Sequence, residues 1–396
     1  MDCNRNRRSV ATCVDAEAID FRGRLLTAVR SARMGFGAFF LVCAAAVFCA
    51  LAVSPARAAD DQAIYDKSGS IAFIGYSEAG SARWRAIDYP NFEKRMKIYA
   101  PNVTTHFYDP QGNAATQLTM ARSAILSKPS LIVFMTVSNA PRAILDEAKN
   151  AGIPVALYIF APTELPPDNT IVGLVRSDPL EVGKLQAQYV LDHEPQGAHL
   201  AIVDGDMAMD FAQLMHRGML DLLKPAFDSG RLKLVGNAVA QGWLAANAQA
   251  QVASILTANS NQVDAIIMGN DNMALGAIPA VRNAGLEGKV LIVAQDAIVA
   301  ALRAIMQGQM TGTVYRDFHE ESDGIAKVAA YTLAKRPLPD GFYQSELKIG
   351  SQSIPQRQTP MTIVDKSNIA QVIKDGMATK EEICQGLPSS VGAPCY

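Results

Sequence analysis

The feature that most constrains the fold is a regular alternation of short apolar runs with amphipathic segments of helical spacing. Candidate strands in the first half of the chain lie at residues 70–76, 103–109, 131–137 and 154–160. A strand with apolar side chains on both faces, such as LIVFMTV at 131–137, is typical of a parallel sheet that is covered by helices. The first half therefore predicts a series of βαβ units.

The alternation repeats in the second half, with candidate strands at residues 199–205, 232–238, 265–268, 289–296 and 310–317. Two βαβ series of similar length predict an α/β fold with two doubly wound parallel-sheet lobes. The chain is large enough for this, because 396 residues with 49% hydrophobic and 19% charged side chains can form two domains with apolar cores.

Polar side chains directly follow several of these apolar runs in the sequence. Asn270 and Asp271 come just after the run 265–268, while Asp296 and Arg316 lie at the ends of two later runs. In open α/β sheets, ligands bind beyond the carboxyl ends of the strands. Because a buried charge without a partner is costly, we expect these groups to pair with one another or with a ligand.

The first 58 residues differ from the rest of the chain. Several arginines precede an uncharged run at residues 34–55, and Ala56-Arg57-Ala58 fits the small-x-small rule for signal cleavage. We therefore expect a signal peptide over residues 1–58 and an exported protein that begins near Ala59. The competing interpretation is a retained membrane anchor, because the apolar run is long enough to span a bilayer.

Two cysteines, Cys384 and Cys395, remain after the expected leader. In an oxidising compartment, two cysteines this close in sequence most simply form one disulfide. A metal site would need more ligands, and no histidine lies near them in the sequence. We expect neither a metal nor a cofactor.

Short motifs spread over nearly all of the chain after the leader resemble the type I periplasmic sugar-binding proteins of ABC transporters, in particular their xylose-binding branch. They include ARWR at 82–85, QGWLAANA at 241–248, DAIIMGNDNMALGAI at 264–278, LIVAQDA at 291–297 and GTVYR at 312–316. The resemblance implies a monomeric periplasmic protein. Such a protein would capture a small polyhydroxylated or sugar-like ligand in a cleft between its lobes and deliver it to an ABC transporter permease.

The family fold implies two lobes joined by three crossovers, which we place near residues 175–178, 315–317 and 349–354. The N-terminal lobe then comprises residues 59–176 and 317–348. The C-terminal lobe comprises residues 177–316 and 349–396. The lobes of this family close on their ligand by a hinge motion.

The family's ligand-binding positions carry over by motif. The matching residues here are Arg83 with Trp84 beside it, Trp243, Asn270 with Asp271 beside it, Asp296 and Arg316. Arg316 stands where the family has a lysine, which keeps the charge but changes the donor geometry. Asn270 also fits the simpler role of a helix N-cap, and Asp296 and Arg316 could form an ion pair with each other.

Two departures from the family pattern concern the ligand. The family has Asp-Arg after the strand that corresponds to residues 154–158, whereas this chain has Ile159 and Phe160. Phe211 stands where the family has an asparagine. Three polar sugar-binding groups are thus replaced by apolar side chains. This favours a polyol, a deoxy or methylated sugar, or a less polar amphiphile or aromatic ligand over D-xylose.

Other classes of protein fit less well. The formal net charge of −2 gives no reason to expect nucleic acid. A transcriptional regulator of the same two-lobe fold is disfavoured by the signal segment and by the lack of a helix-turn-helix motif. The sequence contains no G-x-S-x-G, H-E-x-x-H or phosphate-loop motif, so an enzyme is also disfavoured. A periplasmic sensor remains an alternative to the permease as the partner.

Overall fold

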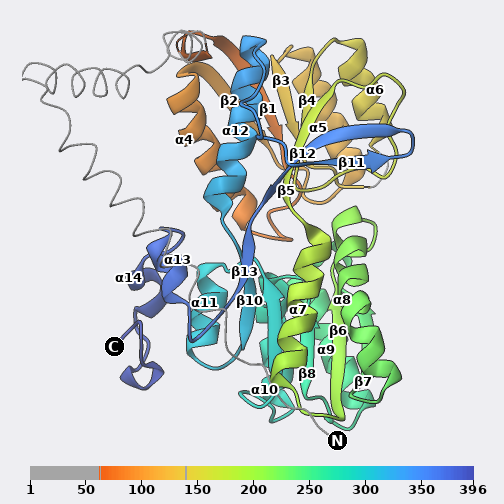
Figure 1. Ribbon diagram of the computed structural model, residues 1–396, viewed down its shortest axis with the longest axis vertical. Coiled ribbons are helices and arrows are strands. Elements are labelled where there is room, and N and C mark those ends of the chain that lie inside the picture. Colours follow the sequence, from red (N-terminus) through yellow and green to blue (C-terminus); the bar gives the residue numbers. More distant parts are fainter. Residues whose placement is uncertain (1–61, 63, 139–140) are drawn as a thin grey trace, which may run out of the picture. The chain divides into compact units, whose positions relative to one another are not determined.

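The computed structural model describes residues 62, 64–138 and 141–396 (Figure 1). The expected signal peptide lies outside these residues. In the part of the chain that is described, no helix combines the length and the apolar character that a membrane span requires.

The first of two sheets has seven strands in the order β11-β12-β5-β4-β3-β1-β2. All neighbours in it are parallel except β11 and β12, which form an antiparallel hairpin. Every residue of β3 and β4 is buried, as expected for a sheet covered on both faces. The strands are β1 (Ser68–Ile74), β2 (Asn102–Tyr108), β3 (Leu131–Phe134), β4 (Val155–Tyr158), β5 (Ile171–Ser177), β11 (Ser345–Ile349) and β12 (Gln352–Thr359).

The second sheet has six strands in the order β13-β10-β9-β8-β6-β7, and only β13 runs antiparallel to its neighbour. Its strands are β6 (Ala198–Asp204), β7 (Leu232–Val239), β8 (Ala265–Met268), β9 (Leu291–Gln295), β10 (Gly312–Arg316) and β13 (Met361–Asp365). The predicted class, an α/β fold with two doubly wound parallel sheets, is confirmed.

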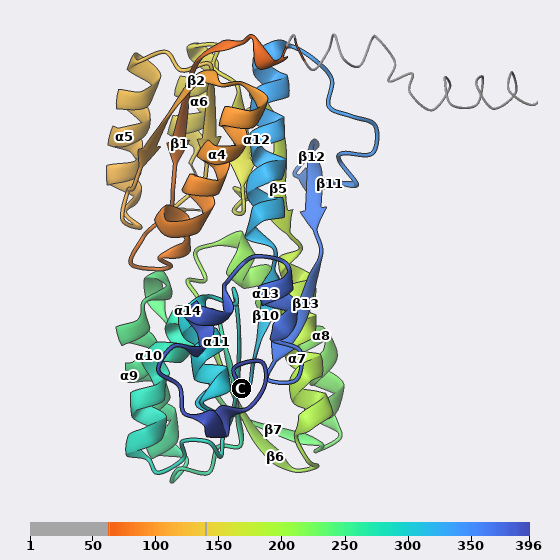
Figure 2. The same cartoon turned by 90° about the vertical axis from the view of Figure 1, so that its left-hand side faces the viewer.

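Helices pack on each sheet, and each sheet with its helices is called a lobe below (Figures 1 and 2). The first lobe contains α4 (Tyr89–Tyr99), α5 (Ala114–Leu126), α6 (Arg142–Asn150) and α12 (Phe318–Ala334). The second lobe contains α7 (Pro179–His193), α8 (Asp210–Asp228), α9 (Ala245–Ala258), α10 (Asp271–Asn283), α11 (Val299–Met306), α13 (Ala370–Lys374) and α14 (Lys380–Cys384).

The chain passes between the lobes at three crossings, after β5, after β10 and after β12. At the first two, the polar residue beyond the strand caps the next helix. The side chain of Asp178 accepts a hydrogen bond from the backbone N–H of Leu180, and that of Asp317 accepts from His319 and Glu320. These caps satisfy free N–H groups of α7 and α12 and set the point where each helix begins.

The third crossing lies later than the sequence analysis placed it. We expected it near residues 349–354, with residues from 349 onward in the second lobe, but β12 pairs with β5 in the first sheet and β13 pairs with β10 in the second. The crossing is therefore at Pro360, where Figure 2 shows β12 running on into β13. The hairpin was missed because its strands are half exposed and form no continuous apolar run.

The C-terminal segment packs against α11 of the second lobe. Leu302 and Met306 of α11 share an apolar cluster with Ile369, Val372 and Ile383. The expected disulfide joins Cys384 and Cys395, whose Cα atoms are 5.3 Å apart. The disulfide thereby fixes the last residues of the chain against this apolar cluster.

Candidate ligand-binding site

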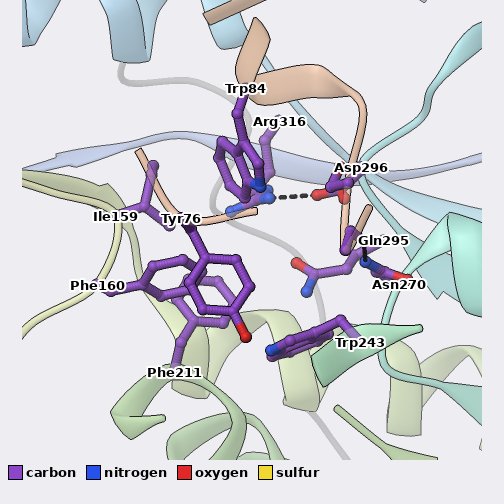
Figure 3. Close-up of a pocket in the computed structure, with 12 residues that line it drawn as sticks. Tyr76, Trp84, Ile159, Phe160, Phe211, Trp243, Asn270, Gln295, Asp296 and Arg316 are labelled. Carbon is purple, nitrogen blue, oxygen red and sulfur yellow. Dashed lines mark hydrogen bonds and ion pairs between the residues drawn. The ribbon is translucent and has the colours of Figure 1, made fainter. Parts of the chain in front are cut away.

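A buried pocket lies where the two lobes meet (Figure 3). In this arrangement of the lobes its free volume is about 20 Å³, enough for about one water molecule, because the lining side chains nearly fill it. The first lobe contributes Tyr76, Gly80, Ser81, Trp84, Ile159 and Phe160. The second lobe contributes Phe211, Trp243, Asn270, Gln295, Asp296 and Arg316.

The lining residues follow from strand ends in both sheets. Gln295 and Arg316 are the last residues of β9 and β10, and Asn270 lies two residues beyond the end of β8. Phe160 lies two residues beyond the end of β4. Parallel strands bring their carboxyl ends to one edge of the sheet, which is where open α/β folds bind ligands.

The backbone is strained at three pocket residues. Ile159, Trp243 and Asp296 have φ angles of 61°, 59° and 112°. Positive φ is uncommon for any residue with a side chain, and it is a genuine outlier for a β-branched one such as Ile159. Strain of this kind persists only where the surroundings enforce it, and it gathers at functional sites. It turns these three side chains toward the pocket.

One side of the pocket is an aromatic cluster centred on Phe160. Its ring centroid lies 5.2 Å from that of Tyr76, 5.9 Å from Trp84 and 5.8 Å from Phe211, all in edge-to-face geometry. Phe211 belongs to the second lobe, so the last of these contacts joins the two lobes. Each such pair contributes about 0.5–1.5 kcal/mol beyond the area that it buries.

Trp243 is held in place by its own loop. The ring lies so close to Gly205 that a Cβ added there would be 2.3 Å from the ring. Asp206 accepts hydrogen bonds from the backbone N–H of Gly242 at 3.0 Å and from Gln241 Nε2 at 2.7 Å, which fixes the short 3₁₀ turn η2 (Gln241–Trp243). The indole is therefore oriented before any ligand binds.

The other side of the pocket is polar. Arg316 donates a hydrogen bond from Nη2 to Asp296 Oδ1, and both side chains are buried. Gln295 donates from Nε2 to the carbonyl oxygen of Gly269 at 2.9 Å, and its amide group extends into the pocket (Figure 3).

Asn270 has two structural roles at the edge of the pocket. Its Oδ1 accepts a hydrogen bond from Met273 N at 2.9 Å and so caps α10, while its Nδ2 donates to the carbonyl oxygen of Gly80 at 3.1 Å. The second bond joins the lobes. Asn272 donates to the same carbonyl oxygen at 3.3 Å, so two hydrogen bonds from the second lobe hold this loop of the first lobe at Gly80.

Arg83 does not line the pocket but lies behind it, fully buried. Its guanidinium donates to Asp88 at 2.8 and 2.6 Å, and Nη2 also donates to Glu321 Oε2 at 2.6 Å. Its Nη1 lies 3.5 Å from Asp296 Oδ1 in the second lobe. Burial acts to lower the pKa of Arg83, but these carboxylates hold it well above its usual range. The residue thus supports Asp296 rather than facing a ligand.

Glu321 connects this cluster to the crossings. Its Oε1 accepts from Ser177 Oγ at 2.6 Å and from Thr359 Oγ1 at 3.4 Å, the last residues of β5 and β12. Arg316, at the end of β10, lies 3.8 Å from the same oxygen. Burial acts to raise the pKa of Glu321, but Arg316 and Arg83 hold it below its ordinary value. One ionised carboxylate thus contacts all three strands that lead between the lobes.

Asp271, which the family motif places beside Asn270, also lies outside the pocket. As the first residue of α10 it points beneath the strand ends. There it accepts hydrogen bonds from Thr313 Oγ1 at 2.7 Å and from Ile298 N at 2.9 Å. Burial, together with the charge of Asp296, raises the pKa of Asp271 well above its usual range. Its contacts are those of a residue that holds the strand ends together. No group of three or more potential metal ligands occurs among the described residues.

Sequence reasoning missed Tyr76, Gly80 and Ser81 as pocket residues. Tyr76 ends the first apolar run, so the strand-end rule applied to the other strands would have found it. Gly80 and Ser81 lie in a loop that has no comparable signal.

The fold and the pocket define a two-lobe solute-binding protein. A family model described as a periplasmic binding protein domain matches residues 71–337, and the chain belongs to this family. The resemblance inferred from the sequence motifs is thereby confirmed.

Two relatives and one solved structure illustrate the match. The D-xylose-binding periplasmic protein of Haemophilus influenzae is 36% identical over 61% of this chain and 70% of its own length. The protein of the same name from Escherichia coli is 33% identical over 69% of this chain and 81% of its own length. An ABC transporter solute-binding protein from Clostridium phytofermentans, solved with β-D-glucose, has a TM-score of 0.70 at 20% identity. The similarity covers 79% of this chain and 99% of that one, and it shows the fold alone.

Proposed function

We propose that this protein captures one small sugar-like molecule between its lobes and presents it to the permease of an ABC importer. The observation that carries the proposal is the pocket itself, which takes six lining residues from each lobe. A ligand held there would be enclosed only when both lobes contact it. The role is binding and delivery rather than catalysis.

The lobes close over the pocket by contacts on both sides of it. Asp210, the first residue of α8, accepts hydrogen bonds from Arg176 Nη1 at 2.6 Å and from the backbone N–H of Ala161 at 3.1 Å, and both donors belong to the first lobe. With the bonds from Asn270 and Asn272 to Gly80, these contacts hold the closed arrangement. Opening about the three crossings would expose them to water.

The sequence and the relatives support a periplasmic location. Residues 1–58 carry the pattern of a signal peptide, and both D-xylose-binding relatives are named as periplasmic proteins. We expect the exported protein to begin near Ala59, to be a monomer and to carry the disulfide between Cys384 and Cys395. Intact mass, measured with and without reductant and alkylation, tests the start and the disulfide. Free thiols on both cysteines of the exported protein would contradict the pairing.

Intrinsic fluorescence gives a direct test of binding, because the chain has two tryptophans and both line the pocket. We expect monosaccharides or polyols that bind to change this fluorescence and to raise the melting temperature. Calorimetry then gives the affinity. A panel of pentoses, hexoses, deoxysugars and polyols that produced no change in either signal would overturn the proposal.

A further inference from the structure

The pocket is chemically divided, and the division identifies the class of ligand. We propose that the ligand is an uncharged monosaccharide that lacks a hydroxyl group on one edge, that is, a deoxysugar. This inference rests on the proposed function above. It is argued from the apolar side of the pocket, from its free polar atoms and from its charge.

The apolar side comes from both lobes. Ile159 and Phe160 follow β4, and Phe211 lies in the first turn of α8, with relative exposures of 1%, 4% and 1%. None of these side chains has a hydrogen-bond donor or acceptor. A ligand hydroxyl placed against them would lose its bonds to water and gain none. Such a loss weakens binding by roughly 5- to 150-fold.

Buried polar atoms elsewhere around the pocket, including one on Trp84 of the aromatic cluster, need partners. In residues 62, 64–138 and 141–396, the buried Nε1 atoms of Trp84 and Trp243 lack a hydrogen-bond partner, as do Nε and Nη1 of Arg316 and Oε1 of Gln295. Four of these five atoms are donors and one is an acceptor. Their residues are grouped around the pocket in Figure 3. A ring oxygen and hydroxyl oxygens on one edge of a sugar would supply the acceptors.

The charge around the pocket excludes an anionic ligand. Arg316 is paired with Asp296, and Arg83 is paired with Asp88 and Glu321. Three carboxylates thus face two guanidinium groups, so no uncompensated positive charge is left for a sugar acid or a sugar phosphate. The donors toward the ligand are therefore suited to neutral oxygens.

The test compares sugars that differ by one hydroxyl group. The pairs are D-fucose and D-galactose, L-rhamnose and L-mannose, and 2-deoxy-D-ribose and D-ribose, with D-xylose as a further probe. Calorimetry and tryptophan fluorescence are measured on the full exported protein. We expect at least one deoxysugar to bind about 10-fold or more tightly than its hydroxylated partner and than D-xylose.

Three variants test whether Phe211 causes the preference for the deoxysugar. Phe211→Asn places the polar group of the family at this position and should reduce the ratio within the preferred pair to about 1. Phe211→Leu keeps the site apolar and should preserve the ratio even if the asparagine variant folds poorly. Phe92→Leu is the matched control, because Phe92 is equally buried but packs on Phe73 in the core of the first lobe. It should leave the ratio unchanged.

The outcomes separate the two proposals. Equal or tighter binding of the hydroxylated sugar in every pair, or tighter binding of D-xylose, overturns the deoxysugar inference but supports a sugar-binding pocket. If the ratio of the two affinities within the preferred pair is unchanged in Phe211→Asn, the apolar side of the pocket does not select the deoxysugar, and the inference is likewise overturned. If no sugar of either kind binds, both the inference and the proposed function fail.

Discussion

The two sides of the pocket occupy equivalent places in the fold and have opposite chemistry. Ile159 and Phe160 follow β4 of the first sheet, while Gln295, Asp296 and Arg316 end or follow β9 and β10 of the second. Topology therefore decides where a ligand sits, and the few residues after each strand decide what it can be. A fold shared with sugar-binding relatives does not by itself transfer their ligand.

The two sides of the pocket also differ in how their residues are held in place. The polar side is backed by a second layer of charges, Arg83 and Glu321, that holds Asp296 and Arg316 in place. The apolar side is held by aromatic contacts centred on Phe160. Damage to the polar side should therefore affect binding and stability together, whereas a conservative change on the apolar side should mainly alter selectivity.

The largest expected effect comes from Arg316→Ala, which removes the main donor of the polar side. The variant leaves the buried Asp296 with Arg83, at 3.5 Å, as its nearest cation. Removing one partner of a buried ion pair costs about 3–5 kcal/mol of stability. We expect a loss of that size in the free energy of unfolding, measured by urea titration, and no detectable binding of any sugar that the unmodified protein binds.

Two variants control for this result. Arg122→Ala removes an exposed ion pair with Glu147 and should leave the urea midpoint of unfolding nearly unchanged, because exposed ion pairs add little stability. Arg316→Lys keeps the charge and should retain weakened binding. Full binding by Arg316→Ala would show that the polar side does not hold the ligand.

A smaller effect is expected from Gly205→Ala, which tests the orientation of Trp243. The new Cβ would overlap the indole, and overpacking of this kind costs about 1–3 kcal/mol. Displacement of the ring should shift the fluorescence emission and weaken sugar binding. In the control Gly230→Ala the new Cβ meets nothing within 4 Å, although the residue has φ of 70°. That variant should lose some stability and keep both optical signals, and the same loss of binding in both variants would refute the role of Trp243.

The smallest effect concerns His216, which lies on α8 of the second lobe and is 2.8 Å from Asp204. The hydrogen bond to Asp204 raises the pKa of His216 above its ordinary value. The pair should therefore contribute its full stability below about pH 6.5 and lose it as pH rises through the raised pKa of the folded state. Melting temperatures measured between pH 5.5 and 8.5 should fall more for the unmodified protein than for His216→Gln. Parallel curves would contradict this.

Sequence reasoning found the strands that have a clear local pattern of apolar residues. Apolar runs identified most of the strands, including β3, β4, β8 and β9, because burial on both faces leaves a continuous signal. The hairpin β11–β12 and the strand β5, in which Gly173 and Arg176 interrupt the apolar run, were missed for the opposite reason. The position of the third crossing was wrong as a consequence.

The sequence by itself determined the α/β class and the edge of the sheets at which polar groups gather, and it places the apolar residues Ile159, Phe160 and Phe211 where the family resemblance implies polar ones. Only the tertiary structure decided that Phe160 and Phe211, 51 positions apart, meet edge to face, and that Arg83 and Asp271 stand behind the pocket rather than in it. The physical reason is that burial patterns are local, whereas the direction of a side chain beyond a strand depends on backbone dihedrals and on partners from distant segments. The positive φ of Ile159 and Asp296 illustrates this, because nothing in their local sequence requires it.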